Sequence, residues 1–287
     1  MKNSDSLYLA VRGLRYHVRH WPSPGAPKMF LVHGWMDVSA SFQFLVDALR
    51  GKWDVYAPDW RGYGLTEWGK SDCYWFPDYL ADLEAVLDSL QRDAPVNLVG
   101  HSLGGNVAAL YAGIRPERIA KLVNLEGFGL PQTRPEQAPK RYRAWLDELK
   151  ERPGLKPYRD FDELSARLRR NNPRLTQVRA DFLARHWGKE EGSGVVLRGD
   201  PAHKIINPLL YRYEEVRAVW QQVSAPVLWV EATDSDTLRR MKMDAGEAAR
   251  RREAFPNLRH AIVRDAGHML HHDQPEAVAR LLEEFLA

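Results

Sequence analysis

Apolar positions in the first 130 residues alternate between two patterns. Short apolar runs end at polar or glycine residues, and the longer segments between them carry apolar residues at helical spacing. The short runs predict strands at 7–11, 14–21, 29–34, 54–59, 96–100 and 119–127. The longer segments predict helices at 41–50, 76–91 and 103–116. Strands that alternate with helices indicate a parallel sheet covered on both faces, and the Arg12-Gly13 turn indicates an antiparallel hairpin at its edge.

The pattern changes between residues 131 and 217. Strand-like runs disappear there, and arginine-rich segments of helical spacing take their place. These segments predict helices at 137–150, 162–170 and 175–187. Strand runs return at 225–232 and 257–263, and a helix at 275–287 closes the chain. We therefore predict a core of residues 1–130 and 218–287, with residues 131–217 inserted as a helical lobe over the ends of the strands.

Composition narrows the class of protein. The chain has 287 residues, of which 44% are hydrophobic, and this is enough for one large core with an inserted lobe. A net charge of +3 gives no reason to expect a nucleic-acid partner. The start of the chain lacks the apolar stretch of a secretion signal, and no run approaches the ~18 apolar residues of a membrane span. With a single cysteine, Cys73, we expect a cytoplasmic protein that does not enter a membrane. The sequence gives no evidence on oligomeric state.

Polar stretches follow four of the predicted strands. They are HGW at 33–35, HSLGG at 101–105, TDSD at 233–236 and DAGHML at 265–270. Ligands of open α/β sheets bind beyond the carboxyl ends of the strands. We therefore expect these stretches to form one site. No metal-binding cluster or phosphate-binding loop is evident in the sequence, so neither a metal nor another cofactor is expected.

Ser102 lies in the sequence VNLVGHSLGG, between a predicted strand and a predicted helix. A sharp turn at this point crowds the positions two residues before and after the serine, and glycine stands at both. G-x-S-x-G between strand and helix is the nucleophile elbow. A serine hydroxyl needs a base and a carboxylate that orients this base. His268 follows the last strand and is the predicted base, whereas His271 and His272 are expected at the surface.

Four motifs together identify a family resemblance. HGW, DWRGYGLT (59–66), GHSLGG (100–105) and GH (267–268) resemble, in order, the motifs of α/β-hydrolases of the serine type with a helical cap. This resemblance implies a mostly parallel eight-stranded sheet with helices on both faces and an inserted helical cap. It also implies an oxyanion hole made by the backbone N–H groups of Trp35 and Leu103. His33 is expected either to orient this loop or to be a satisfied buried histidine.

The DWRGYGLT stretch is expected to be architectural. Asp59 and Arg61 would fix loops near the site, and the two glycines would form turns.

The carboxylate of the predicted triad has three candidates in the sequence. The family usually has Gly-x-x-Asp after the seventh strand, but Ala232 replaces the glycine here and Ser235 stands where the aspartate would be. Some members have G-x-x-S-D instead, which maps the acid onto Asp236, with Asp234 as the second choice. Glu126 is a third candidate, because some members take their acid from just after the preceding strand. The favoured interpretation of Glu126 is a structural carboxylate that binds loop amides.

These residues predict a serine hydrolase that cleaves a carboxylic ester or related acyl bond through an acyl-enzyme on Ser102. Lactones, thioesters and a carbon–carbon bond of a diketone are also substrates of this superfamily. Dehalogenases and epoxide hydrolases are disfavoured because they attack with a carboxylate at the elbow. Non-catalytic binding of a small ligand on the same fold is the alternative.

Tryptophans indicate the kind of substrate. The chain has 10 of them, and several fall in loops at the predicted active edge or in or beside the inserted lobe. These are Trp35, Trp60, Trp68, Trp75, Trp145, Trp187 and Trp220. They favour a small-molecule substrate with an apolar or aromatic group.

Overall fold

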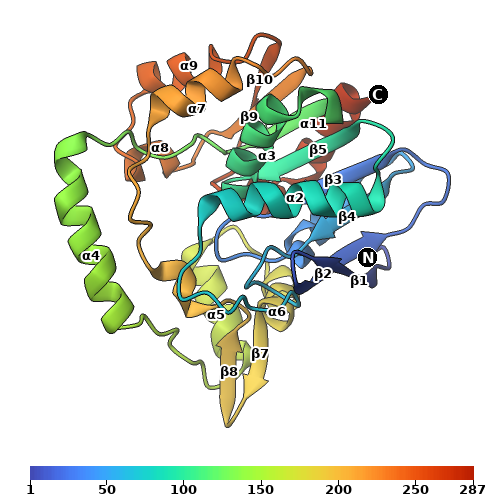
Figure 1. Cartoon of the computed structure of the whole chain (residues 1–287). Coiled ribbons are helices and arrows are strands. Elements are labelled where there is room, and N and C mark those ends of the chain that lie inside the picture. Colours follow the sequence, from blue (N-terminus) through green and yellow to red (C-terminus); the bar gives the residue numbers. More distant parts are fainter.

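An eight-stranded sheet forms the centre of the computed structural model, which describes residues 1–287 (Figure 1). Its order is β1-β2-β4-β3-β5-β6-β9-β10. The strands are β1 Asp5–Val11, β2 Leu14–Trp21, β3 Lys28–Val32, β4 Asp54–Pro58, β5 Val96–His101, β6 Ile119–Leu125, β9 Val227–Ala232 and β10 Leu258–Val263. β2 pairs antiparallel with β1 and β4, and all other neighbours are parallel. The predicted fold class, a mostly parallel sheet with an antiparallel edge, is confirmed.

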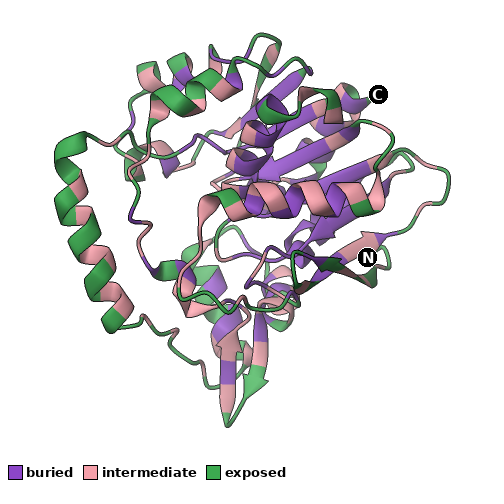
Figure 2. Cartoon of the chain, viewed as in Figure 1, coloured by how far each residue is buried: buried purple, intermediate pink, exposed green.

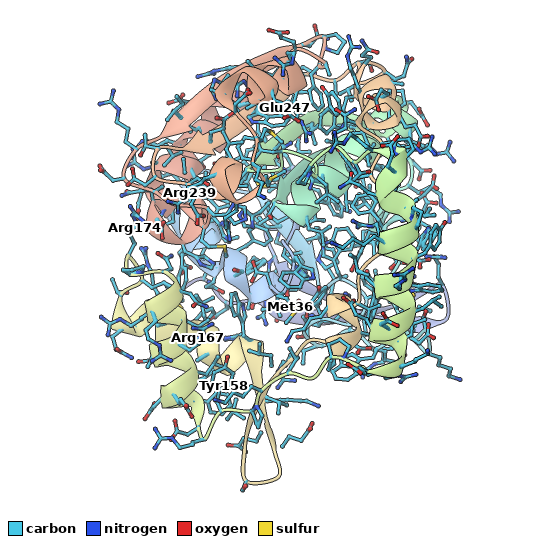
Figure 3. The ribbon with its side chains drawn as sticks, turned by 90° about the vertical axis from the view of Figure 1, so that its left-hand side faces the viewer. Met36, Tyr158, Arg167, Arg174, Arg239 and Glu247 are labelled. Atoms are coloured by element: carbon cyan, nitrogen blue, oxygen red, sulfur yellow. The ribbon has the colours of Figure 1, made fainter.

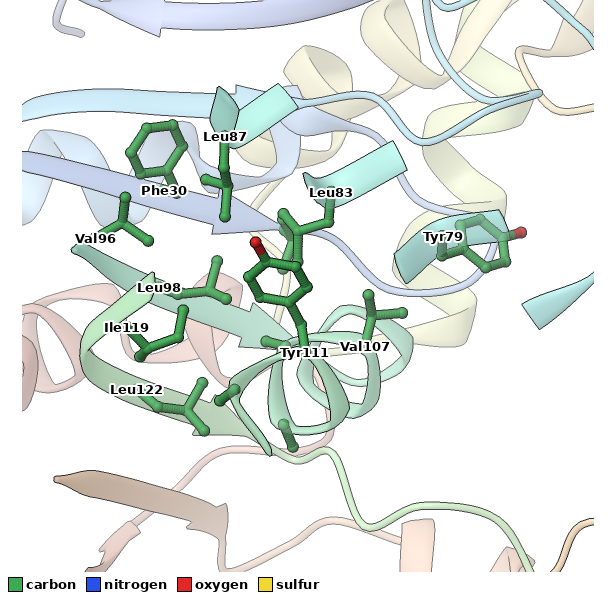
Figure 4. Packing of buried hydrophobic residues seen from close by; sticks show 14 of the residues in the cluster. Phe30, Tyr79, Leu83, Leu87, Val96, Leu98, Val107, Tyr111, Ile119 and Leu122 are labelled. Carbon is green, nitrogen blue, oxygen red and sulfur yellow. The ribbon is translucent and has the colours of Figure 1, made fainter. Parts of the chain in front are cut away.

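Helices cover both faces of this sheet. The core helices are α1 Gln43–Ala48, α2 Phe76–Leu90, α3 Leu103–Ile114, α7 Tyr213–Trp220, α8 Thr237–Arg240, α9 Ala245–Arg252, α10 Leu270–Asp273 and α11 Pro275–Leu286. One apolar cluster joins α2 and α3 to the sheet through residues such as Leu83, Val107 and Leu98 (Figure 4). A second cluster joins α1, α10 and α11 to the opposite face. The central strands are continuous apolar runs because both of their faces are buried (Figure 2).

The segment between β6 and β9 differs from the sheet in composition and packing. It contains α4 Ala138–Lys150, α5 Phe161–Asn171, α6 Gln177–Trp187, β7 Gly188–Glu191 and β8 Gly194–Leu197. Residues of α5, α6 and β8 share a small apolar cluster, which Phe44 links to the core. By contrast, α4 has no buried residue and lies to one side of the sheet (Figures 1 and 2). The division into core and lobe at residues 131 and 217 stays a prediction.

The structure adds elements that the sequence pattern did not predict. The β7–β8 hairpin lies within the segment expected to be wholly helical, and its first strand, GKEE, has no apolar alternation to reveal it. The short helices α8 and α9 were also not predicted. None of the helices combines the length and apolar character needed to cross a membrane.

Candidate active site

Ser102 occupies a strained turn between β5 and α3. Its backbone has φ 53° and ψ −115°, which L-residues rarely adopt. A side chain at Gly100 would overlap the Gly104 carbonyl, and one at Gly104 would overlap the Val32 carbonyl. Glycine is therefore required two residues before and two residues after the serine. This is the local geometry that the sequence motif predicted.

The imidazole of His268 lies between the serine and a carboxylate. Its Nε2 is 3.0 Å from Ser102 Oγ, and its Nδ1 is 3.2 Å from Glu126 Oε2. His268 lies in the loop between β10 and α10, so the loops after β5, β6 and β10 meet at this point. A hydroxyl, an imidazole and a carboxylate thus form one hydrogen-bonded line, the arrangement that activates a serine nucleophile.

Glu126 is held rigidly in this line. It follows β6 in a left-handed conformation, with φ 58°, and its side chain is 0% exposed. Its Oε1 accepts a hydrogen bond from the Ala232 backbone N–H at 2.8 Å, and its Oε2 accepts one from the Ser235 hydroxyl. The carboxylate therefore has fixed partners besides His268. It does bind a backbone amide, at the last residue of β9, much as expected of a structural carboxylate, but it also faces the imidazole.

The expectation that Asp236 faces His268 is wrong for this structure. Asp236 instead forms ion pairs with Arg239 and Arg240, at 3.5 and 3.0 Å, and its side chain is 42% exposed. The second choice, Asp234, pairs with Arg174 at 2.5 Å. Figure 3 shows Arg174 and Arg239 on one side of the molecule. The turn after β9 directs both aspartates toward these arginines, whereas the intervening Ser235 points inward to Glu126.

Thr237 is a site residue that sequence reasoning missed. Its Oγ1 is 2.9 Å from His268 Nδ1 and 2.9 Å from Ser235 Oγ. The Nδ1–H of the imidazole thus has two acceptors, Thr237 and Glu126. No sequence signal marks a single threonine in such a loop. The one available clue was Ser235, which stands where the family has a carboxylate and leaves that role to another residue.

The two predicted oxyanion donors flank Ser102. Leu103 supplies the first N–H of α3, which has no partner inside the helix. Trp35 lies in the loop after β3, and a Cβ on the preceding Gly34 would be 3.2 Å from Ser102 Cβ. Neither the Trp35 nor the Leu103 N–H donates to another backbone group. Both amides are therefore free to donate to a bound oxygen.

His33 fixes the loop that carries Trp35. Its Nδ1 donates to the Gly34 carbonyl at 2.8 Å, and its Nε2 accepts from the Trp60 N–H at 3.0 Å. Burial lowers the pKa of His33 to about 4, so the ring is neutral. His33 was expected either to orient this loop or to be a buried histidine with its hydrogen bonds satisfied. It does both.

The DWRGYGLT stretch has the architectural contacts that were expected. Asp59 accepts hydrogen bonds from the Ser39 and Leu65 N–H groups, at 2.6 and 2.9 Å. Burial alone would raise the pKa of Asp59, but hydrogen bonds, led by that of His17, hold it well below its usual range. Arg61 binds Asp82 through two hydrogen bonds of 2.6 Å.

His271 and His272 are not at the surface, which corrects the sequence expectation. They are 0% and 2% exposed, because α10 folds inward against the segment before α1. His272 Nε2 is 2.5 Å from Ser41 Oγ, and the His271 ring lies 5.3 Å from that of Phe42. Neither is hydrogen-bonded to Ser102, and His268 is the histidine that is.

An apolar cleft of about 240 Å³ lies beside the site. Asn106 lines it and lies one helical turn after Ser102, whose carbonyl accepts its N–H at 3.0 Å. The apolar part of the lining is Trp75, Phe76, Pro77, Leu110, Leu130, Leu209, Leu210, Tyr211, Val216 and Trp220. Charged groups also line it, among them Arg141 and Arg212. Of the tryptophans singled out in the sequence, Trp75 and Trp220 line this cleft. Trp60 and Trp220 are both fully buried.

Known proteins resemble this chain over most of its length. The family description "alpha/beta hydrolase fold" matches residues 27–275. A serine hydrolase-like protein of Danio rerio is 29% identical over 272 residues, which cover 92% of this chain and 82% of that protein. A cis-3-alkyl-4-alkyloxetan-2-one decarboxylase of Shewanella oneidensis is 38% identical over 134 residues, which cover 45% and 41% of the two chains. Among solved structures, a thioesterase domain from the curacin biosynthetic pathway superposes with a TM-score of 0.87 at 23% identity, covering 98% of this chain and 99% of that one.

Proposed function

The chain belongs to the α/β-hydrolase family, and we propose that it is a serine hydrolase that cleaves a carboxylic ester or a related acyl bond. The hydrogen-bonded line of Ser102, His268 and Glu126 carries this proposal. The serine hydrolase-like relative and the thioesterase neighbour are consistent with acyl chemistry. Some relatives are epoxide hydrolases, such as epoxide hydrolase 4 of Mus musculus, but a serine stands at the elbow of this chain.

In the proposed first step, Ser102 Oγ attacks the acyl carbon while His268 Nε2 takes the hydroxyl proton. The carbonyl oxygen becomes an oxyanion and accepts hydrogen bonds from the N–H groups of Trp35 and Leu103. One such donor is worth about 3 kcal/mol of barrier in a comparable enzyme. The tetrahedral intermediate then collapses, and His268 returns the proton to the leaving alcohol or thiol. An acyl-enzyme remains on Ser102.

The second step releases the acid. A water molecule attacks the acyl carbon, and His268 takes a proton from it as the new bond forms. The second tetrahedral intermediate collapses and the proton passes to Ser102 Oγ, which restores the enzyme. In both steps Glu126 and Thr237 accept the Nδ1–H of His268, which keeps Nε2 directed at the reacting oxygen. The Glu126 carboxylate also stabilises the imidazolium that forms in each step.

The cleft beside α3 indicates the substrate class. Its wall is mostly apolar and aromatic, and such walls bind apolar groups of small molecules. We propose that it accommodates an apolar or aromatic group on the acyl or alcohol side of the substrate.

Removal of the nucleophile tests the proposed function. Ser102→Ala should lower kcat for p-nitrophenyl esters at least ~10⁴-fold, because the remaining groups have no nucleophile to activate. Thermal unfolding should show that the variant stays folded. If the variant turned over esters like the parent, Ser102 would not be the nucleophile. A parent protein that hydrolyses no ester or thioester of a broad panel would favour non-catalytic ligand binding instead.

A further inference from the structure

A second cluster of polar side chains lies buried next to the triad. Asp37 follows β3, His101 ends β5, and His271 belongs to α10. One nitrogen or carboxylate oxygen from each lies within 4.8 Å of those of the other two. The three residues are 3%, 1% and 0% exposed. Fold topology thus brings together three residues that the sequence separates by 64 and 170 positions.

Atoms of this cluster lack hydrogen-bond partners. Asp37 Oδ2, His101 Nδ1 and both ring nitrogens of His271 are buried and unpaired. A buried polar group without a partner costs about 1–3 kcal/mol. A ligand bound at this point would satisfy several such groups at once. The other Asp37 oxygen, Oδ1, already accepts the Val38 N–H at 2.8 Å.

His101 is oriented as metal-binding histidines are. Its Nε2 is 2.8 Å from the backbone carbonyl of His268, which can only accept, so Nε2 carries the hydrogen. Its Nδ1 is buried and has no hydrogen-bond partner, so this is the nitrogen available to a ligand. Metal-ligating histidines commonly donate their other N–H to a backbone carbonyl in this way. Gly34 leaves space beside this atom, since a Cβ there would lie 3.1 Å from His101 Nδ1.

We propose that Asp37, His101 and His271 bind a first-row transition-metal ion of the zinc type. Two imidazole nitrogens and one carboxylate oxygen are the ligands of many zinc sites, whereas magnesium and calcium prefer oxygen alone. Tetrahedral ligand atoms at about 2.1 Å from one ion lie about 3.4 Å apart, so side chains whose ligand atoms are within 4.8 Å of one another would close by up to about 1.4 Å.

The ion would connect the three loops that form the active site. Asp37 lies in the loop of Trp35, His101 precedes Ser102, and His271 lies three residues after His268. Because His101 also donates to the His268 carbonyl, a bound ion would fix the position of the base. The ion would not touch the reacting atoms. Metal binding is therefore separate from the proposed hydrolysis and is measurable in a protein that hydrolyses nothing.

Cobalt titration of the full chain tests this site. The protein is stripped with a chelator, dialysed and titrated with Co²⁺, whose visible absorption reports ligand geometry, and Zn²⁺ is then added as a competitor. The proposal predicts one Co²⁺ per chain, displaced by Zn²⁺, and a higher unfolding temperature with either ion. A folded parent without stoichiometric binding would overturn it.

Three variants locate the ion. His271→Phe keeps an aromatic ring beside Phe42 but removes two unpaired nitrogens, so the metal-free protein should fold at least as well as the parent. Its Co²⁺ affinity should fall at least ~100-fold. His260→Gln, at a partly exposed histidine paired with Glu231, should bind like the parent. His268→Gln should also retain the ion. Binding kept in His271→Phe, or lost in His268→Gln alone, would contradict the assignment.

Discussion

Backbone strain and hydrogen bonds together fix Glu126. A glutamate at φ 58° is unfavourable, and such strain persists where the surrounding structure holds it in place. The Ala232 N–H and the Ser235 hydroxyl do so here, and they leave Oε2 within 3.2 Å of His268 Nδ1. The position of this one side chain determines which carboxylate orients the proposed base.

Glu126→Gln should lower kcat about 10³- to 10⁴-fold, because a mispositioned imidazole tautomer costs about 10⁴ in a comparable triad. Asp236→Asn is the matched control, since Asp236 pairs only with surface arginines, and it should change kcat by less than ~2-fold. Steady-state kinetics on a p-nitrophenyl ester measure both. If kcat fell more in Asp236→Asn than in Glu126→Gln, Asp236 would be the carboxylate that orients His268, as the sequence predicted.

His203 makes the stability of the fold depend on pH. Its ring lies between those of Tyr63 and Tyr74, at centroid distances of 3.8 and 3.5 Å, and burial lowers its pKa to about 3. The unfolded chain binds a proton at this histidine near pH 6.5, whereas the folded chain does not until about pH 3. Stability from this group is therefore present above pH 6.5 and is lost as the pH falls below it.

Between pH 7.5 and pH 5, the parent should lose about 2 kcal/mol more unfolding free energy than His203→Phe. Phenylalanine keeps the stacking but has no group that titrates. Urea unfolding at the two pH values gives the comparison, and other buried histidines affect both proteins equally. Equal losses in parent and variant would show that His203 is not kept neutral by the fold.

At this scale the sequence predicted two of the three members of the proposed triad. Ser102 and His268 stand in motifs whose spacing reflects local backbone geometry. The sequence ranked Asp236 and Asp234 ahead of Glu126 as the carboxylate, because the direction of a side chain after β9 depends on distant partners. Asp234 turns to Arg174, 60 residues away, and no local pattern contains that information.

Among the elements, α3 links the nucleophile to the apolar cleft. Ser102 stands at its start, and Asn106 and Leu110, on its next two turns, line the cleft. We propose that the apolar group of a substrate attached at Ser102 lies along this helix in the cleft.

Leu110→Trp should block this path. Hydrolysis of long-chain or aromatic esters should fall more than ~10-fold in kcat/KM, while acetate esters change by less than ~2-fold, because only the larger group needs the cleft. The control is Val178→Trp on α6, which adds the same side chain at an exposed position, where Val178 is 75% exposed. It should leave hydrolysis of all esters unchanged. A uniform loss for all esters would mean that the cleft does not select the substrate.

Elements with strong internal patterns were predicted, and those held by distant contacts were not. The central strands and α2, α3 and α11 carry long apolar runs or stripes that identify them without tertiary information. In α9, by contrast, the buried Arg251 donates to the carbonyls of Phe128 and Leu130, at 2.6 and 2.9 Å. An arginine-rich segment of this kind becomes a helix through contacts made 121 and 123 residues away.

At the scale of the whole molecule, the order of strands in the sheet brings the residues of the candidate active site together. β5, β6 and β9 are parallel neighbours, with β10 next to β9, so the loops after them open at one edge. Ser102 and His268 are thereby brought together across 166 residues of sequence. The same topology assembles Asp37, His101 and His271 beneath that edge, which is why neither cluster is visible as one motif in the sequence.

Labelling with a fluorophosphonate tests the central claim most directly, because this probe phosphonylates only a serine activated by a base. Intact-mass and peptide mapping of the treated protein should find one adduct, on Ser102, which is absent from Ser102→Ala and strongly slowed in Glu126→Gln. An unmodified parent under conditions that label a known serine esterase, or an adduct on another residue, would contradict the account.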